Sequence, residues 1–178
     1  MLEMKIGLTV SMQDGQLPGV EVTAMETSIQ SWSGVEKPMD AAFMLNCFYS
    51  IEPADRQALF QKLSSQQLAP NGIVIIKAEL NGPTCGLMRL LERLGNPSKG
   101  LYDEVERDML AAGFSLVYTQ DIKTPDDRPM SNPSDDLVNF IQILSNNKAS
   151  EPEVRTAIAD IYGSMKSHTH TKMAIFTK

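Results

Sequence analysis

The sequence predicts a single α/β domain over residues 1–178, with a mostly parallel β-sheet and flanking helices, because strand-like and helix-like segments alternate along the chain. Residues 72–77 are the clearest expected strand, since a run of β-branched side chains follows the chain break at residues 70–72. Residues 41–45 are apolar without polar alternation, which is typical of a strand covered on both faces. A chain of 178 residues is long enough to bury the core of one such domain.

The first half of the chain supplies three more patterns. Residues 20–25 alternate apolar and polar side chains, as a half-exposed strand does. Residues 2–12 alternate strictly as well, which is also a strand pattern. Residues 52–55 are expected to open a helix, with Asp55 as a candidate cap, and the apolar face of this helix consists of Leu59, Phe60 and Leu63.

The second half of the chain predicts four amphipathic helices and two strands, residues 115–122 and 173–177. A capping pattern begins the second helix, which ends at Gly113, and a similar pattern begins the fourth. These two patterns are Asp103 with Glu106 and Ser150 with Glu153. The expected apolar faces are, in order, Leu87, Leu90, Leu91 and Leu94; Val105, Met109 and Leu110; Leu137, Phe140, Ile141 and Leu144; and Val154, Ala157, Ile158 and Ile161.

Residues 123–165 are expected to form an insertion that consists of a loop and helices. Its first part, residues 123–136, is polar, contains three prolines and is too long for a simple turn. Loops of this kind often act as lids or specificity loops.

Composition excludes several classes of function. The 16 Lys and Arg residues are outnumbered by 22 Asp and Glu residues, and a net charge of −6 disfavours binding to nucleic acid or to an anionic membrane surface. Cys47 and Cys85 lie too far apart for a CxxC motif, which excludes a disulfide scaffold and a zinc ribbon and fits a reducing compartment. No secretory signal pattern and no long apolar segment is present, so we expect a cytoplasmic protein that contacts neither membrane nor nucleic acid.

Three features carry side chains suited to chemistry. Asn46 and Tyr49 follow strand 41–45, and ligands of open α/β sheets lie at the carboxyl ends of parallel strands. The alternative is that Tyr49 belongs to the core and Asn46 caps a turn. Thr27 and Ser28 follow strand 20–25, where their hydroxyl groups suit either a bound nucleoside or the cap of the next helix.

His168 and His170 precede the last expected strand and face the same way, but no third ligand of a suitable kind accompanies them. We therefore expect no metal site. One of the two histidines could still line a substrate pocket as a base.

A family resemblance links these pieces. Residues 39–49 carry an Asp followed by an apolar strand, and residues 68–76 carry L-x-P-x-G followed by a second apolar strand. This block resembles class I S-adenosylmethionine-dependent methyltransferases. A closer likeness, to histamine N-methyltransferase and its relatives, lies in residues 26–28, residues 45–51, the short helix after Glu79, the Pro/Asp-rich insertion and residues 135–137. It runs from about residue 18 to the end of the sequence.

The resemblance implies S-adenosylmethionine as cofactor, a small-molecule amine as substrate, and particular roles. Thr27 and Ser28 would contact the adenine end of the cofactor, and Leu45 would pack on it. Asn46 and Tyr49 would face the amine, with Thr169, or His170 if the register shifts by one, beside the acceptor nitrogen. Phe140 would be an aromatic side chain of the substrate pocket. The resemblance would also make residues 2–12 helical.

Members of the family have further elements before the part that this sequence resembles. The family begins with a strand, a Gly-rich loop and a second strand that ends in an acid, and these have no counterpart in the sequence; Ser50 also replaces an aromatic residue. The match is thus to a truncated Rossmann-like sheet with strands equivalent to 3–7. The family order 3-2-1-4-5-7-6 would leave 4-5-7-6 contiguous, with residues 41–45 at an edge. Residues 20–25, residues 2–12 or a second copy in a homodimer would then cover that edge.

Three functions follow from these observations. The first is a small-amine N-methyltransferase that transfers the methyl group directly. The second is a non-catalytic truncated remnant or interaction module, which the missing Gly-rich loop favours. The third is an unrelated α/β ligand-binding domain, which requires the resemblance to be accidental.

Overall fold

The computed structural model describes residues 31–80, 86–95, 100–125, 133–145, 148–163 and 168–178. The chain divides into two compact units, residues 1–34 and residues 35–178, and every helix and strand reported below belongs to the second unit. The segments 2–12 and 20–25, for which strands are expected, lie outside the described residues, as do Thr27 and Ser28.

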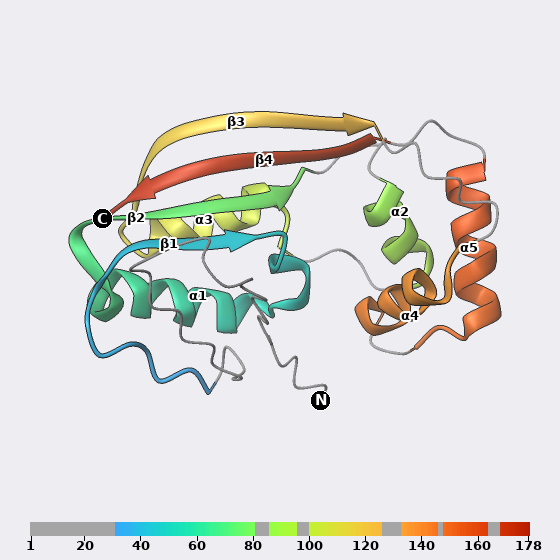
Figure 1. The fold of residues 1–178 in the computed structure, drawn as a ribbon, viewed down its shortest axis with the longest axis horizontal. Coiled ribbons are helices and arrows are strands. Elements are labelled where there is room, and N and C mark those ends of the chain that lie inside the picture. Colours follow the sequence, from blue (N-terminus) through green and yellow to red (C-terminus); the bar gives the residue numbers. More distant parts are fainter. Residues whose placement is uncertain (1–30, 81–85, 96–99, 126–132, 146–147, 164–167) are drawn as a thin grey trace, which may run out of the picture. The chain divides into compact units, whose positions relative to one another are not determined.

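Four strands form one sheet in the order β1-β2-β4-β3 (Figure 1). They are β1 (Met39–Leu45), β2 (Leu68–Glu79), β3 (Ser115–Pro125) and β4 (His168–Thr177). β1 pairs with β2 in parallel, and β4 runs antiparallel to both β2 and β3. This confirms the predicted α/β fold and its contiguous 4-5-7-6 order. Three strands point the same way, although two of the three pairings are antiparallel.

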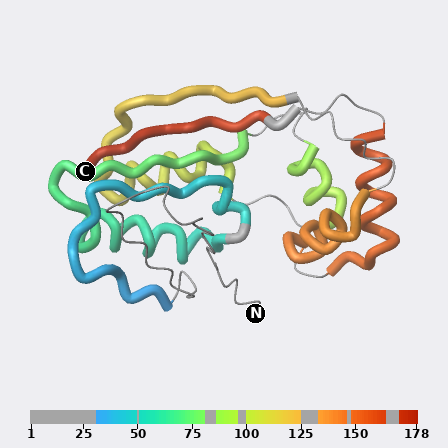
Figure 2. The backbone as a smooth tube through the Cα atoms, in the orientation of Figure 1, coloured from blue at the N-terminus to red at the C-terminus, as the bar shows by residue number. Residues whose placement is uncertain are grey.

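Two helices cover one face of this sheet (Figures 1 and 2). They are α1 (Pro53–Lys62) and α3 (Tyr102–Ala111), which pack against each other, and α3 also contacts β2, β3 and β4. β2 is buried at alternate residues because a strand points successive side chains to opposite faces. Val74 and Ile76 are fully buried, as are Phe60 of α1 and Val105 of α3.

Three further helices form a second hydrophobic cluster. They are α2 (Gly86–Arg93), α4 (Asp135–Leu144) and α5 (Glu151–Gly163). The buried members of this cluster are Leu90, Leu91, Val138, Ile141, Leu144, Ala149, Val154, Ala157, Ile158 and Ile161. The expected apolar face of α5 is confirmed at all four positions, and that of α2 is buried at Leu90 and Leu91 and partly buried at Leu87 and Leu94. None of the helices in the described part of the chain is long and apolar enough to cross a membrane.

Several local expectations about the helices are wrong. α1 opens within residues 52–55 as expected, but its N-cap is Glu52 and its first residue is Pro53, so Asp55 lies inside the helix and is not the cap. α3 is capped at Leu101 without the Asp103 side chain. Leu110, which we expected to be buried, is 48% exposed on the outer side of α3.

Of the two predicted capping patterns, the one before α3 is wrong and the one before α5 is confirmed. The Glu104 carboxylate, rather than Glu106, accepts a hydrogen bond from the N–H of Gly100 at 2.9 Å at the start of α3. The pattern before α5 is confirmed, because the Glu153 carboxylate accepts from both the N–H and the hydroxyl group of Ser150, at 2.7 and 2.6 Å. Gly113 ends α3 as expected, with a φ of 88° that favours glycine.

A buried ion pair joins the two helices under the sheet. The Arg56 side chain of α1 is fully buried, and its Nε donates to Asp108 of α3 at 2.7 Å. Its Nη2 lies 2.6 Å from the same carboxylate and 3.5 Å from Glu104. Gln57 donates to the other oxygen of Asp108 at 3.2 Å. The buried charges of Arg56 and Asp108 neutralise each other, so removing either side chain would leave the other charge buried without compensation.

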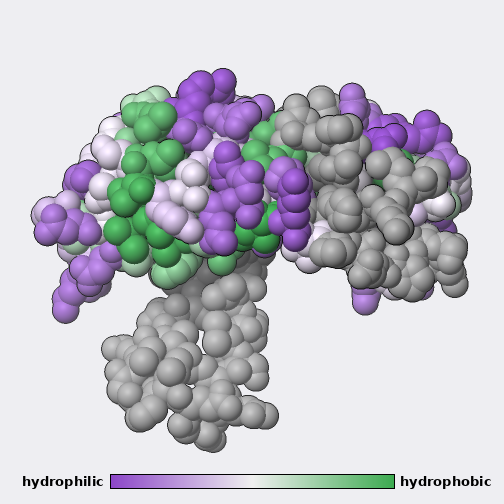
Figure 3. All heavy atoms as spheres, turned by 90° about the horizontal axis from the view of Figure 1, so that it is seen from above, coloured by the Kyte–Doolittle hydropathy of each residue, from purple (hydrophilic) through white to green (hydrophobic). Residues whose placement is uncertain are grey.

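One edge of the sheet is formed by β1, which pairs only with β2 among the described residues. Phe43 and Leu45 of β1 are 66% and 52% exposed, so the expectation that residues 41–45 are covered on both faces is wrong at these two side chains. Exposed apolar side chains also occur at the start of β3, namely Leu116, Val117 and Tyr118. Figure 3 views the molecule from above the orientation of Figure 1 and shows hydrophobic side chains, in green, gathered on part of this face. The expectation that a second copy covers the β1 edge stays a prediction.

We predict that Asp108→Ala lowers the free energy of unfolding by roughly 3–5 kcal/mol, because it leaves the Arg56 charge buried without its main partner. Urea denaturation followed by circular dichroism measures this. The control is Asp160→Ala, which breaks an exposed ion pair with Arg93 at 2.9 Å and should cost less than about 1 kcal/mol. Equal losses in the two variants would contradict a structural role for the buried pair.

Candidate functional site

The chain turns sharply where β1 ends, and this turn begins the candidate site. Asn46 has a φ of 54°, a left-handed conformation that asparagine adopts more readily than most residues. Its N–H donates to the carbonyl oxygen of Lys77 in β2 at 2.9 Å, which extends the parallel pairing by one bond. The side chain of Asn46 is exposed, and the chain continues into the short 3-10 turn Phe48–Ser50.

A small recess lies at the carboxyl ends of β1 and β2. It has a volume of about 10 Å³, which is close to the space that one water molecule needs. Its walls come from the turn after β1, the end of β2, helix α2 and the residue that precedes the N-cap of α3. The lining residues are Asn46, Phe48, Tyr49, Ala78, Glu79, Met88 and Gly100.

Gly100 lets the backbone approach the turn closely. Its φ is 74°, and a Cβ atom at this position would lie 2.4 Å from the carbonyl oxygen of Phe48. Because the obstructing atoms include backbone, a larger residue would have to displace the turn. Phe48 in turn is buried and meets the Phe60 ring of α1 edge-on, with ring centroids 6.1 Å apart. The recess is therefore anchored to the core.

Tyr49 joins this recess to the second helical cluster. Its ring meets the ring of Phe140 in α4 at 89°, with centroids 6.5 Å apart. Burial raises the pKa of the Tyr49 hydroxyl above its usual value, and nearby Cys47 and Glu79 raise it further. Tyr49 is therefore a neutral phenol near pH 7, able to donate or accept a hydrogen bond.

The structure brings together three of the residues singled out from the sequence. Asn46 and Tyr49 both line the recess, and Phe140 contacts Tyr49 because it lies at the border of the buried stripe of α4, 42% exposed. The expected apolar face of α4 is thus wrong at Phe140, since Val138 occupies the buried position instead. Leu45 lies half exposed at the end of β1.

The C-terminal candidates lie in β4. His170 is placed with its carbonyl oxygen accepting from the N–H of Leu80 at 2.8 Å, directly after β2. Its imidazole Nε2 lies 3.7 Å from the Asp121 carboxylate of β3, rather than in the recess. The backbone of Thr169 pairs with Thr124, and its role beside an acceptor amine stays a prediction.

The recess is also lined by Glu79, Met88 and Gly100, which the sequence analysis did not single out. The signal for Glu79 was present, because it ends the strongest strand of the sequence and the carboxyl ends of parallel strands carry ligands. The role of Gly100 can be recognised only from the structure, through the close approach to Phe48 that it permits. No group of three His, Cys, Asp or Glu side chains that could hold a metal ion occurs within the described residues.

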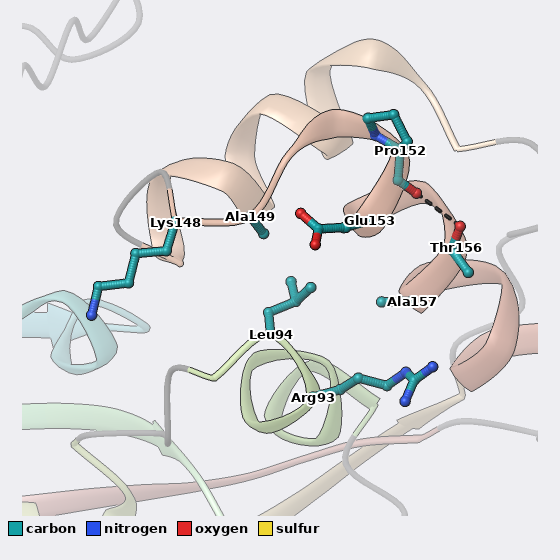
Figure 4. Close-up of a pocket in the computed structure, with 8 residues that line it drawn as sticks. All are labelled: Arg93, Leu94, Lys148, Ala149, Pro152, Glu153, Thr156 and Ala157. Atoms are coloured by element: carbon teal, nitrogen blue, oxygen red, sulfur yellow. Dashed lines mark hydrogen bonds between the residues drawn. The ribbon is translucent and has the colours of Figure 1, made fainter.

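A larger hollow lies between α2 and the start of α5 (Figure 4). Its volume is about 400 Å³, and Leu94 and Ala157 provide an apolar floor. Three of its polar side chains are engaged locally: Glu153 caps α5, Arg93 pairs with Asp160, and Thr156 donates to the carbonyl oxygen of Pro152 at 2.8 Å. The hollow is therefore a weaker candidate than the recess at the strand ends.

Comparisons with known proteins identify the fold. No family model and no curated protein matches the sequence. Among solved structures, a protein from Bacillus halodurans C-125 assigned as a methyltransferase has a TM-score of 0.55 at 7% identity, over 84% of this chain and 74% of its own. A protein from Galdieria sulphuraria assigned as a sarcosine dimethylglycine methyltransferase has a TM-score of 0.50 at 16% identity, over 85% and 57%.

A mycolic acid cyclopropane synthase, crystallised with SAH and CTAB, also matches with a TM-score of 0.50 at 12% identity, over 85% of this chain and 58% of its own. The chain has the class I methyltransferase fold. It spans less than two thirds of the length of the synthase and of the Galdieria sulphuraria protein. The recess lies at the strand ends where ligands of open α/β sheets bind.

Gly100→Ala should destabilise the protein more than Gly95→Ala. Both glycines have a φ slightly above 70°, but a Cβ at Gly95 would meet no atom within 4 Å. Gly95→Ala should therefore cost only the conformational penalty of about 1–2 kcal/mol. The additional loss in Gly100→Ala, read from urea denaturation, reports the close approach to Phe48. Equal losses would show that this approach is not needed.

Cys47 should be unreactive as a nucleophile, because burial raises the pKa of its thiol to about 11. In a Cys85→Ser variant, the rate of reaction with a disulfide reagent should rise about tenfold per pH unit from pH 8 to pH 10, in proportion to the thiolate. In urea the same rate should level off near the ordinary pKa of about 8.5. A native rate that levels off at pH 8 or 9 would contradict the assignment.

Proposed function

We propose that this chain binds S-adenosylmethionine and takes part in the transfer of its methyl group to a small amine. The observation that carries the proposal is the recess at the ends of β1 and β2, where Asn46 and Tyr49 meet on a methyltransferase fold. The crystallisation of a fold neighbour with SAH supports the cofactor, and another neighbour's assignment to sarcosine and dimethylglycine supports the amine. The likeness to histamine N-methyltransferase adds the same substrate class.

The described residues fit one side of such a cofactor. The recess is far too small for a nucleoside, so the cofactor would lie outside it, over the exposed end of β1. Leu45 offers an apolar surface there, and the turn at Asn46 carries the chain away from it. Thr27 and Ser28 would hold the adenine end.

When bound, S-adenosylmethionine supplies a methyl group on a positively charged sulfur. The contribution of this chain is to orient the amine, because direct transfer depends on alignment more than on acid–base catalysis. The Asn46 amide and the neutral Tyr49 hydroxyl would hydrogen-bond the amine, with Phe140 beside Tyr49 and Thr169 or His170 as a further polar contact.

A second candidate function is a non-catalytic interaction module. The observation that favours it is the β1 edge, where Phe43 and Leu45 are exposed and no described strand pairs on the outer side. Exposed edges of this kind pair readily with another chain. A homodimer through β1 is the form that this function would take.

Calorimetric titration with S-adenosylhomocysteine tests the cofactor proposal. We expect saturable binding, and ligand at 100 times its dissociation constant should add about 2.7 kcal/mol of stability, which is visible as a rise in melting temperature. Leu45→Ser and Ser28→Ala should weaken binding. Leu110→Ser is the matched control, because Leu110 is similarly exposed but lies on α3. No heat and no melting shift at millimolar ligand would reject binding and favour the interaction module.

A further inference from the structure

The sheet has two faces, and the described helices α1 and α3 cover one of them (Figure 2). Val74 and Ile76 of β2 are fully buried on this face, as is their neighbour Ala174 of β4. Lys172 of β4 points the same way, because its Nζ lies 4.8 Å from the ring centroid of Tyr102 in α3. The side chains between these residues point to the opposite face, since a strand directs successive side chains to opposite sides. We call this second face the open face.

The register places an unbroken row of apolar side chains across all four strands of the open face. From β1 to β3 the row consists of Phe43, Ile75, Ile175 and Tyr118. Its two ends are 66% and 47% exposed, and the two central isoleucines are partly exposed. Ile73 of β2 and Met173 of β4 extend the apolar area along the strands in the two directions. A contiguous exposed apolar area of this kind is typical of a surface that binds another protein.

The open face carries very little of the charge of this acidic chain. Its three rows across the four strands are formed by Ile73, Ile75 and Lys77 with their register partners, and Lys77 is the only charged residue in these rows. The chain as a whole has a net charge of −6. Two copies of an acidic protein repel each other least where acidic side chains are absent, so a second copy can approach this face at little electrostatic cost. A strongly charged partner would find no counter-charge in these rows.

The size of the open face suits a weak dimer. Strands lie about 4.8 Å apart and side chains on one face about 6.8 Å apart along a strand, so three rows on four strands cover roughly 400 Å² in projection. Protruding side chains make the accessible area larger, and two copies together reach the roughly 1,000 Å² that a specific interface needs. Two sheets that pack through such faces form a sandwich with an apolar layer about 10 Å thick.

We propose that the open face is a dimer interface, on which a second copy of this chain packs face to face. Its centre is at Ile75 and Ile175, where the two central strands lie side by side. Leu45 lies at its rim, next to the position proposed for the cofactor, and the recess at the strand ends lies beyond the last row. The interface is isologous, so each side chain of the open face contributes twice to the dimer.

Sedimentation equilibrium of the full chain, over concentrations from about 1 µM to about 1 mM, tests this proposal. The mass should rise from that of one chain toward that of two as the concentration is raised. Tyr118→Thr should raise the dissociation constant of the dimer about tenfold or more, because it removes an aromatic anchor from both copies. Threonine suits a strand and Tyr118 is exposed, so the variant should fold, which circular dichroism verifies.

Tyr118 also separates this interface from a dimer that is joined through the β1 edge. It lies on β3, at the opposite edge of the sheet from β1, so strand pairing at β1 would not respond to Tyr118→Thr. Leu110→Ser is the matched control, because Leu110 is 48% exposed but lies on α3. It should leave the dissociation constant of the dimer unchanged.

Three outcomes would overturn the proposal. The first is a dimer that Tyr118→Thr leaves intact, which would favour the β1 edge instead. The second is an equal weakening in Leu110→Ser. The third is the mass of one chain at every concentration; a larger loss of stability in Tyr118→Thr than in Leu110→Ser would then assign the cover of the open face to a segment of the same chain. Binding of S-adenosylhomocysteine is measured separately, so its absence would reject the proposed function without affecting this interface.

Discussion

The parallel pairing of β1 with β2 is the constraint on which the candidate site depends. The register places Leu45 opposite Lys77, and the hydrogen bond from Asn46 to Lys77 continues the ladder past the end of β1. Two strands that end side by side bring their following residues to one place, although 31 residues lie between Leu45 and Lys77 in the chain. Asn46, Tyr49 and Glu79 meet for this reason.

Most of the sheet could be predicted because its strands carry strong signals. The β-branched run at residues 73–76 favours a strand over a helix, and the apolar run at residues 41–45 is too short for a typical helix. Helix boundaries were less predictable. Asp55 is the favoured cap by residue type, but α1 begins at Pro53, whose fixed φ suits a first turn, and Glu52 precedes it without a side-chain capping bond. The predicted burial of Leu110 and Phe140 was wrong, because the helical spacing of apolar residues does not show which residue at the border of the apolar face points to the core.

The site was predictable only in part, for a related reason. Asn46 and Tyr49 follow a recognisable strand, and the rule about strand ends applies to them without knowledge of their neighbours. Glu79 obeys the same rule but stands in a segment whose polarity is also typical of a solvent-exposed strand end. Gly100 and Met88 reach the recess through tertiary contacts, which no local pattern encodes. The imidazole of His170 lies near the Asp121 carboxylate of the neighbouring strand β3, a contact between strands that the local sequence does not encode.

The position of β4 has a consequence for the synthesis of the chain. β2 is a central strand only because β4 lies beside it, and the register joins Ile73 to Thr177 across about a hundred residues. While the ribosome is still making the helices between them, β2 has one hydrogen-bonding edge without its native partner. Long-range pairings of this kind close late and leave apolar edges accessible in the meantime. The nascent protein therefore passes through a stage in which its most hydrophobic strand needs protection from other chains.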